Sequence, residues 1–141
     1  MTPEEKGLLL KDLCARLPYG VKLDNGLKLR SIDMLTEVVS CSGSDKKVEN
    51  VRPYLRPMSS MTKDEREEIE VFIFNKWYQE NSCKIDKEGW IEILANYDVS
   101  GIDPCFCSDY VDWLNAHHFD YLGLIEKGLA LEAPEDMYKI D

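Results

Sequence analysis

Apolar residues near the start of the chain recur with the spacing of a helix. They fall on one helical face and comprise Leu9, Leu10, Leu13 and Leu17. Thr2 precedes a proline, and Glu5 follows at the third position, a combination typical of a capping box at a helix start. Pro18 interrupts the pattern, because its ring cannot continue a helix. The sequence therefore predicts a helix that begins after Thr2 and ends near Arg16.

An alternation of apolar and polar residues replaces the helical spacing after this helix. The Asn-Gly pair that ends at Gly26 is a strong hairpin signal. A two-residue loop would pair Leu23 with Lys28 and would mix unlike side chains on one face. A three-residue loop of residues 24–26 instead pairs Leu23 with Leu27. We therefore predict the three-residue loop, with Gly26 in the left-handed conformation.

A second pair of strands is predicted before the middle of the chain. Residues 37–41 and 47–51 contain several valines and flank a turn-forming segment at residues 42–45. Together with the first hairpin they would give a small antiparallel sheet. Three apolar side chains between the two strand pairs are expected to fill the space behind this sheet: Ile32, Met34 and Leu35.

The second half of the chain is predicted to be mainly helical. Thr62 and Glu65 form another capping box. An apolar stripe at helical spacing follows this box and comprises Ile69, Phe72, Ile73, the stem of Lys76 and Trp77. Two shorter helices are predicted at residues 87–97 and 108–117, with a break between them that ends at Pro104.

The C-terminal residues 113–138 are apolar for a chain end. Those expected to be largely buried are Trp113, Phe119, Tyr121, Leu124 and Leu129. Chain ends fray unless they are docked, so this tail should complete the core. The predicted fold class is α+β, a small antiparallel sheet in the N-terminal half packed with three to four helices. We expect a single domain, with a helix and β-hairpins in residues 1–61 and an acidic helical part with the docked tail in residues 62–141.

The charge of the chain is uneven between these two parts. Residues 1–61 contain ten Lys or Arg and eight Asp or Glu, which gives a net charge of +2. Residues 62–141 contain seven and nineteen, which gives a net charge of −12. The acidic part should repel nucleic acid and anionic membranes, so direct nucleic-acid binding is disfavoured. A protein partner, with a basic surface favoured, fits this charge better.

Composition also narrows the location of the protein. No apolar run approaches the roughly 18 residues of a membrane span, and acidic residues stand where a signal peptide would be basic. The expected location is therefore the cytoplasm. An odd number of scattered cysteines, five in all, suits reduced thiols rather than disulfides. No cofactor signature is present, and no cofactor is expected.

The best local candidate for a binding surface lies at residues 51–57. Arg52 and Arg56 both precede proline, which favours extended backbone, so their side chains should share a face with that of Tyr54. Two guanidinium groups around a phenol could hold a phosphate, a carboxylate or a stacked base. The alternative is an edge strand or connector whose arginines pair with the acidic helices that follow.

Other candidate chemistry is weaker. Cys105, Cys107, His117 and His118 are ligand types that zinc prefers. Only one residue separates the two cysteines, and the two histidines are adjacent in sequence. Neither spacing suits a zinc site, so no metal is predicted. A cysteine nucleophile, Cys83 or Cys107 with one of the histidines, lacks any local activating motif, and structural thiols are favoured.

Three blocks of the sequence resemble a known family. They are residues 10–21, 52–62 and 117–134. Their sequences are similar to those of small uncharacterised proteins encoded by phages and other mobile elements of gut anaerobic bacteria. The resemblance implies a bacterial cytoplasm and a phage or prophage setting, and it implies no catalytic residue. Residues 71–110 depart from the family pattern.

These observations favour a non-enzymatic protein-interaction module. The first alternative is an acidic mimic of nucleic acid that occupies a basic host protein, because residues 62–141 carry most of the negative charge. The second is a small hydrolase or transferase whose anionic substrate binds Arg52, Tyr54 and Arg56. A continuous acidic stripe would favour the mimic, whereas a deep pocket at the arginines would favour the enzyme.

Overall fold

The computed structural model describes residues 1–73 and 104–138. Its helices are α1 (Pro3–Arg16), α2 (Lys63–Ile73) and α5 (Pro104–Ala116). Its strands are β1 (Leu29–Asp33), β2 (Val38–Cys41), β3 (Ser44–Lys47), β4 (Tyr54–Pro57), β5 (Phe119–Asp120) and β6 (Leu131–Glu132). The mixed helix and strand content and the small antiparallel sheet in the N-terminal half confirm the coarse α+β prediction. Three α-helices lie in the described part, and the helix predicted at residues 87–97 falls outside it.

The chain divides into two compact units. The first comprises Met1–Met58 and Asn115–Asp141, and the second comprises Ser59–Leu114. The C-terminal tail thus belongs to the unit that contains the sheet, whereas the sequence analysis grouped it with the acidic helical part. The tail adds strands beside β4, which explains this grouping.

Helix α1 has the predicted limits because both of its ends are specified locally. The Glu5 N–H donates to Thr2 Oγ1 at 3.1 Å, and the Thr2 N–H donates to Glu5 Oε1 at 3.0 Å, which completes the capping box. Leu9 and Leu13 are fully buried in the core of the first unit. This core also contains residues from the sheet and from the tail.

The first hairpin has the predicted register. Lys22 pairs with Lys28, and the Leu23 N–H donates to the Leu27 carbonyl at 2.9 Å. Gly26 has a φ of +81°, as a three-residue loop requires. The sequence prediction is therefore confirmed for this loop.

The antiparallel sheet has the order β1-β2-β3, and its third strand differs from the prediction. A tight turn at Gly43, whose φ is +73°, pairs Cys41 directly with Ser44. The predicted strand at residues 47–51 is therefore wrong. A 3-10 turn at Val48–Asn50 follows β3 instead and buries Val48 in the core.

The loop between β1 and β2 gives a second correction. Met34 is 56% exposed and Leu35 is 96% exposed, so neither fills the space behind the sheet. The Asp33 carboxylate accepts hydrogen bonds from the Leu35 N–H at 3.0 Å and the Thr36 N–H at 3.3 Å. This side-chain turn folds the loop outward, and only Ile32 packs against the core.

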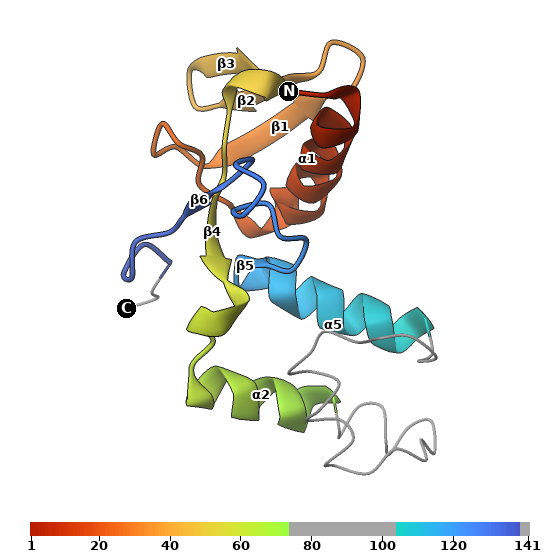
Figure 1. Ribbon diagram of the computed structural model, residues 1–141, viewed down its shortest axis with the longest axis vertical. Helices are drawn as coiled ribbons and strands as arrows, with labels where there is room; N and C mark the ends of the chain where they lie inside the picture. The colour runs from red at the N-terminus through yellow and green to blue at the C-terminus, as the bar shows by residue number, and fades with distance from the viewer. Residues whose placement is uncertain (74–103, 139–141) are drawn as a thin grey trace. The chain divides into compact units, whose positions relative to one another are not determined.

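A second sheet, which the sequence analysis did not predict, joins the tail to the N-terminal half. Its order is β5-β4-β6, and both pairings are parallel (Figure 1). The Ala133 N–H donates to the Leu55 carbonyl at 2.8 Å. The predicted burial of the tail is confirmed for Trp113, Phe119, Leu124 and Leu129. Tyr121 is only half-buried, and its ring centroid lies 5.4 Å from the Arg16 guanidinium carbon.

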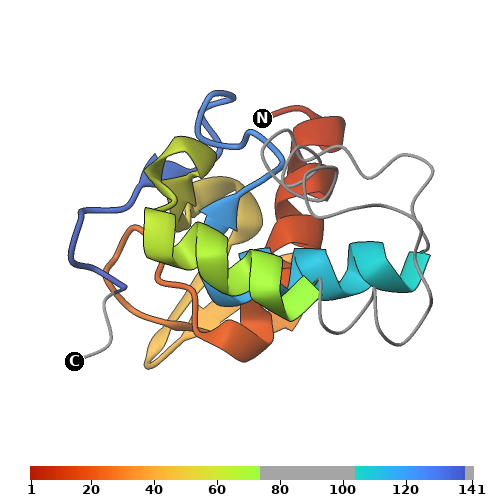
Figure 2. The same ribbon diagram turned by 90° about the horizontal axis from the view of Figure 1, so that it is seen from below.

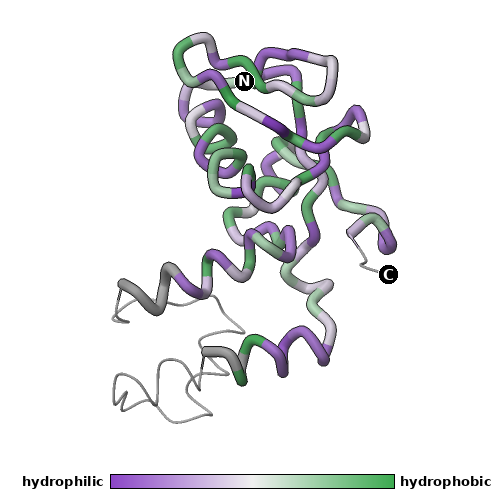
Figure 3. The backbone as a smooth tube through the Cα atoms, turned by 180° about the vertical axis from the view of Figure 1, so that it is seen from behind, coloured by the Kyte–Doolittle hydropathy of each residue, from purple (hydrophilic) through white to green (hydrophobic). Residues whose placement is uncertain are grey.

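The second unit contains α2 and most of α5, which run in opposite directions (Figure 2). Thr62 caps α2 as predicted, since its Oγ1 accepts from the Glu65 N–H at 3.1 Å. The first turns of α2 are strongly hydrophilic (Figure 3), and Ile69 is fully buried. Helix α5 begins at Pro104 rather than at residue 108, because proline is well suited to the first turn of a helix. The predicted apolar side chains beyond Val71 lie outside the described residues.

Candidate anion-binding site

The segment around β4 alternates between buried and accessible side chains. Val51, Pro53 and Leu55 are buried. Arg52 is exposed, and Tyr54 and Arg56 are half-buried. This two-residue period is that of an extended strand, so the three predicted site residues share one side of the segment. They differ, however, in what holds each of them.

Arg52 is the most accessible of the three. Its guanidinium makes no ion pair within residues 1–73 and 104–138. The backbone on its C-terminal side is fixed, because the carbonyl of the next residue, Pro53, accepts from the Leu131 N–H at 2.9 Å. A fixed backbone therefore carries a guanidinium that is available to an external anion.

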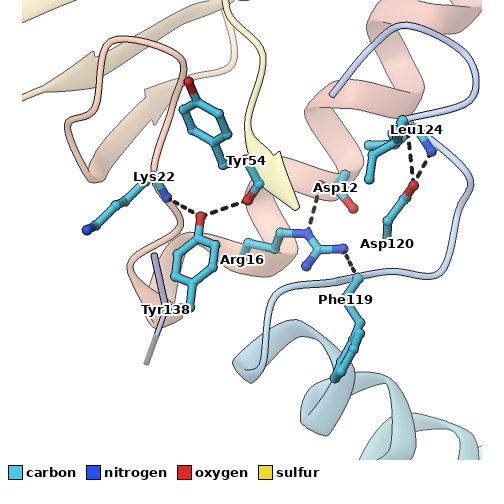
Figure 4. A network of polar contacts seen from close by, with 9 residues as sticks. Asp12, Arg16, Lys22, Tyr54, Phe119, Asp120, Leu124 and Tyr138 are labelled. Carbon is cyan, nitrogen blue, oxygen red and sulfur yellow. Dashed lines mark hydrogen bonds and ion pairs between the residues drawn. The ribbon is translucent and has the colours of Figure 1, made fainter. Parts of the chain in front are cut away.

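Hydrogen bonds hold both the backbone N–H and the backbone carbonyl of Tyr54. Its N–H donates to the Lys22 carbonyl at 2.8 Å, and its carbonyl accepts from the Tyr138 hydroxyl at 2.7 Å. The same hydroxyl accepts from the Lys22 N–H at 2.9 Å, so one phenol joins the first hairpin to β4 (Figure 4). Burial raises the pKa of the Tyr138 hydroxyl to about 12, which keeps it protonated as a donor.

The Arg56 side chain packs against the C-terminal tail. Its guanidinium lies 4.1 Å from the centroid of the Phe119 ring, and one of its N–H groups donates to the His117 carbonyl at 3.5 Å. Phe119 is its direct partner in the parallel pairing of β4 with β5. These contacts give Arg56 a structural role in joining the tail to β4.

A shallow cavity of about 490 Å³, largely open to solvent, adjoins Arg52. Its charged lining residues are Arg52, Lys127, Glu5, Asp24 and Glu49. All of them belong to the first unit. Lys127 was missed by the sequence analysis because it lies in the tail, and no local motif connects it with Arg52.

Two of the carboxylates in this cavity already have partners. Glu49 lies 3.5 Å from Lys6 Nζ, and Glu5 accepts the Thr2 N–H of the capping box. The hydrogen bond from the Thr2 backbone lowers the pKa of Glu5. A backbone hydrogen bond likewise lowers the pKa of Glu49. Asp24 differs, since its Oδ1 is buried and has no hydrogen-bond partner in the described part of the chain.

The turn that carries Lys127 is held by Asp120. The Asp120 carboxylate accepts from the Leu124 N–H at 2.8 Å and the Ile125 N–H at 3.0 Å (Figure 4). Asp120 is 8% exposed, and Leu124 is fully buried. The backbone position of Lys127 is therefore determined by a buried carboxylate four residues before Leu124, where this turn begins.

A buried ion pair supports the same region from the side of α1. Arg16 Nε lies 2.8 Å from Asp12 Oδ2, and the guanidinium also donates to the Phe119 carbonyl. Both side chains are fully buried, and burial raises the pKa of Asp12. These groups bind each other and the tail, so they hold α1 and β5 together.

His118 is another buried polar residue near β4. Its ring stacks on Tyr138, with the centroids 3.7 Å apart. Burial, together with the positive charge of Arg16, lowers the pKa of His118 to about 4, so the ring is neutral at pH 7. Its backbone φ is +64°, in the left-handed region.

The candidate metal and nucleophile residues are only partly described. No group of three or more His, Cys, Asp or Glu in the described part could hold a metal ion. The side chains of Cys105 and Cys107, and all of Cys83, lie outside that part. The absence of a metal and the structural role of the thiols therefore stay predictions.

No family model, curated protein or solved structure matches this chain. Across residues 1–73 and 104–138, no helix combines the length and the apolar character that crossing a membrane requires. Function is therefore inferred from the geometry and charge of the site.

Proposed function

We propose that the protein is a non-enzymatic protein-interaction module that engages an anionic group of its partner through Arg52 and the adjacent face of β4. The observation that carries this proposal is the state of Arg52. It is exposed, it follows a buried residue in a fixed extended segment, and it makes no ion pair within the described residues. An arginine fork in this state is suited to a carboxylate or phosphate.

The buried charged groups are bound to other parts of the fold, which favours a binding function over an enzyme with an anionic substrate. Asp12 and Arg16 bind each other, and Asp120 binds the backbone of the turn that follows it. A general acid or base must be able to reach a substrate. These side chains instead connect elements of the fold.

The resemblance to proteins of phages and mobile elements supplies the setting of the proposal. The module would act in a bacterial cytoplasm and would bind a protein of the host. A basic partner suits the net charge of −12 in residues 62–141.

Mimicry of nucleic acid is a second candidate, supported by the exposed carboxylates at the start of α2. Asp64, Glu67 and Glu68 are all exposed within two turns of this helix. Such a group can attract a basic partner. It would do so without any involvement of Arg52.

Capture of partners from bacterial lysate distinguishes the two candidates. Arg52→Ala should abolish capture of a protein partner, whereas Arg30→Ala, at an exposed arginine of β1, should not. Neutralising Asp64, Glu67 and Glu68 together should abolish capture if the protein mimics nucleic acid. Capture that is indifferent to Arg52→Ala would overturn the proposed role of the β4 face.

A further inference from the structure

We infer that the cavity beside Arg52 binds a mixed-charge peptide segment of the partner. In this arrangement an acidic side chain pairs with Arg52 and Lys127, and a neighbouring basic side chain faces Asp24. The inference rests on the proposed function, and it adds the chemistry of the bound segment.

The cations of the cavity are available to an anion. Arg52 and Lys127 are exposed, and neither makes an ion pair in the described part of the chain. Among the described residues, the Lys127 ammonium donates a single long hydrogen bond, 3.4 Å, to the Leu122 carbonyl. An ammonium group has three donors, so it retains capacity for a carboxylate.

The carboxylates of the cavity set a limit on the anion. Glu5 and Glu49 have partners within the fold, whereas Asp24 is half-buried, lines the cavity and makes no ion pair in the described part of the chain. A polyanion such as nucleic acid would bring further negative charge to three carboxylates and would be repelled. One acidic group accompanied by one basic group matches the available charges.

The lining of the cavity favours a peptide over a small organic molecule. A volume of about 490 Å³ is large enough for several side chains. Small-molecule pockets of roughly 300–1,000 Å³ are usually lined by apolar residues. Here most of the lining is charged or polar, and Leu129 is one of few apolar contributors.

The backbone segments that carry these charged groups are fixed before any ligand arrives. Asp120 fixes the turn of Lys127, and the paired Leu23 and Leu27 fix the loop of Asp24. Preorganisation of this kind reduces the entropy lost on binding.

Fluorescence anisotropy with labelled peptides of equal length tests the inference. The probes are an alternating Glu-Lys peptide, an all-Glu peptide and an all-Lys peptide. The full chain should bind the alternating peptide more tightly than the all-Glu peptide. Arg52→Gln, Lys127→Gln and Asp24→Asn should each weaken that binding by about fivefold, the upper range for one exposed ion pair. Arg30→Gln, which removes an exposed arginine outside the cavity, should not.

Binding of the all-Lys peptide, which reports general attraction to an acidic protein, should be unaffected by Arg52→Gln. The inference is overturned if the all-Glu peptide binds as tightly as the alternating one, or if Arg30→Gln weakens binding as much as Arg52→Gln. If the peptide does not bind but lysate capture still depends on Arg52, only this inference fails. If capture is indifferent to Arg52, the proposed function fails.

Discussion

The two arginines of the β4 segment illustrate how much the surroundings of a residue matter. Arg52 and Arg56 have the same neighbour, a proline, and the same orientation in the strand pattern. Arg56 nevertheless lies over the Phe119 ring, whereas Arg52 adjoins an open cavity. The sequence predicted the shared face but not this difference, because Phe119 comes from a distant part of the chain.

Substitution of the two arginines should therefore affect stability unequally. Arg56→Ala should lower the free energy of unfolding by about 1–2 kcal/mol through lost cation–π contact and packing. Arg52→Ala should leave it unchanged. Urea unfolding of both variants measures the difference. Equal losses would show that Arg52 also has a structural role.

His118 should make stability depend on pH. Its pKa is about 4 in the folded protein against an ordinary value of 6.5. Between these values the unfolded chain binds a proton that the folded protein does not, so stability is complete above pH 6.5 and falls as the pH drops toward 4. The loss should be about 2 kcal/mol once solvent screening is taken into account.

The variant His118→Asn should flatten this pH dependence, because asparagine tolerates the left-handed backbone but does not titrate. His117→Asn serves as the matched control and should keep it. Thermal unfolding of the three proteins between pH 4 and pH 7 provides the comparison. An unchanged slope in His118→Asn would contradict the assignment.

At the level of elements, local signals were reliable where a few neighbouring residues decide the outcome. The capping boxes at Thr2 and Thr62 and the loop ending at Gly26 formed as predicted. The third strand was misplaced, because the sequence did not distinguish a two-residue turn at Gly43 from a longer loop. A shift of this kind moves the following strand toward the N-terminus.

Two glycines give opposite predictions for the same substitution. Gly26→Ala should lower the free energy of unfolding by about 1 kcal/mol, since φ is +81° and alanine is strained there. Gly7→Ala, in the middle of α1, should raise it by roughly 0.5–1 kcal/mol through better helix propensity. An added Cβ meets no atom within 4 Å at either position, so the two substitutions differ only in the backbone conformation that alanine must adopt. Chemical denaturation tests both, and a stabilising Gly26→Ala would contradict the assigned loop.

At the level of the whole molecule, the tail belongs to the core of the first unit. It supplies both strands beside β4 and several of the buried side chains around it. The apolar composition of the tail predicted that it docks. It did not predict where, because parallel pairing of two-residue strands leaves no periodic signal in the sequence.

Truncation of the tail should have graded effects. Ending the chain after Pro134 removes the Tyr138 hydroxyl bridge and should lower stability by about 1–3 kcal/mol. Ending it after Asn115 also removes Phe119, Leu124 and Leu129, each worth about 1.5–3 kcal/mol of burial, and should abolish cooperative unfolding. Calorimetry and limited proteolysis check both results. A cooperatively melting remainder after the longer truncation would show that the tail is an appendage.

The sequence by itself determined the features that depend on neighbouring residues. These are the limits of α1, the register of the first hairpin and the alternation around β4. Tertiary structure decided the rest, since those contacts join residues far apart, as when Arg16 bonds to Phe119 across 103 positions. It placed Lys127 with Arg52 at one cavity and fixed Arg56 on Phe119. Such long-range packing decides which cation stays available to a partner. A local sequence pattern does not predict it, because the contacting residues are far apart in the chain.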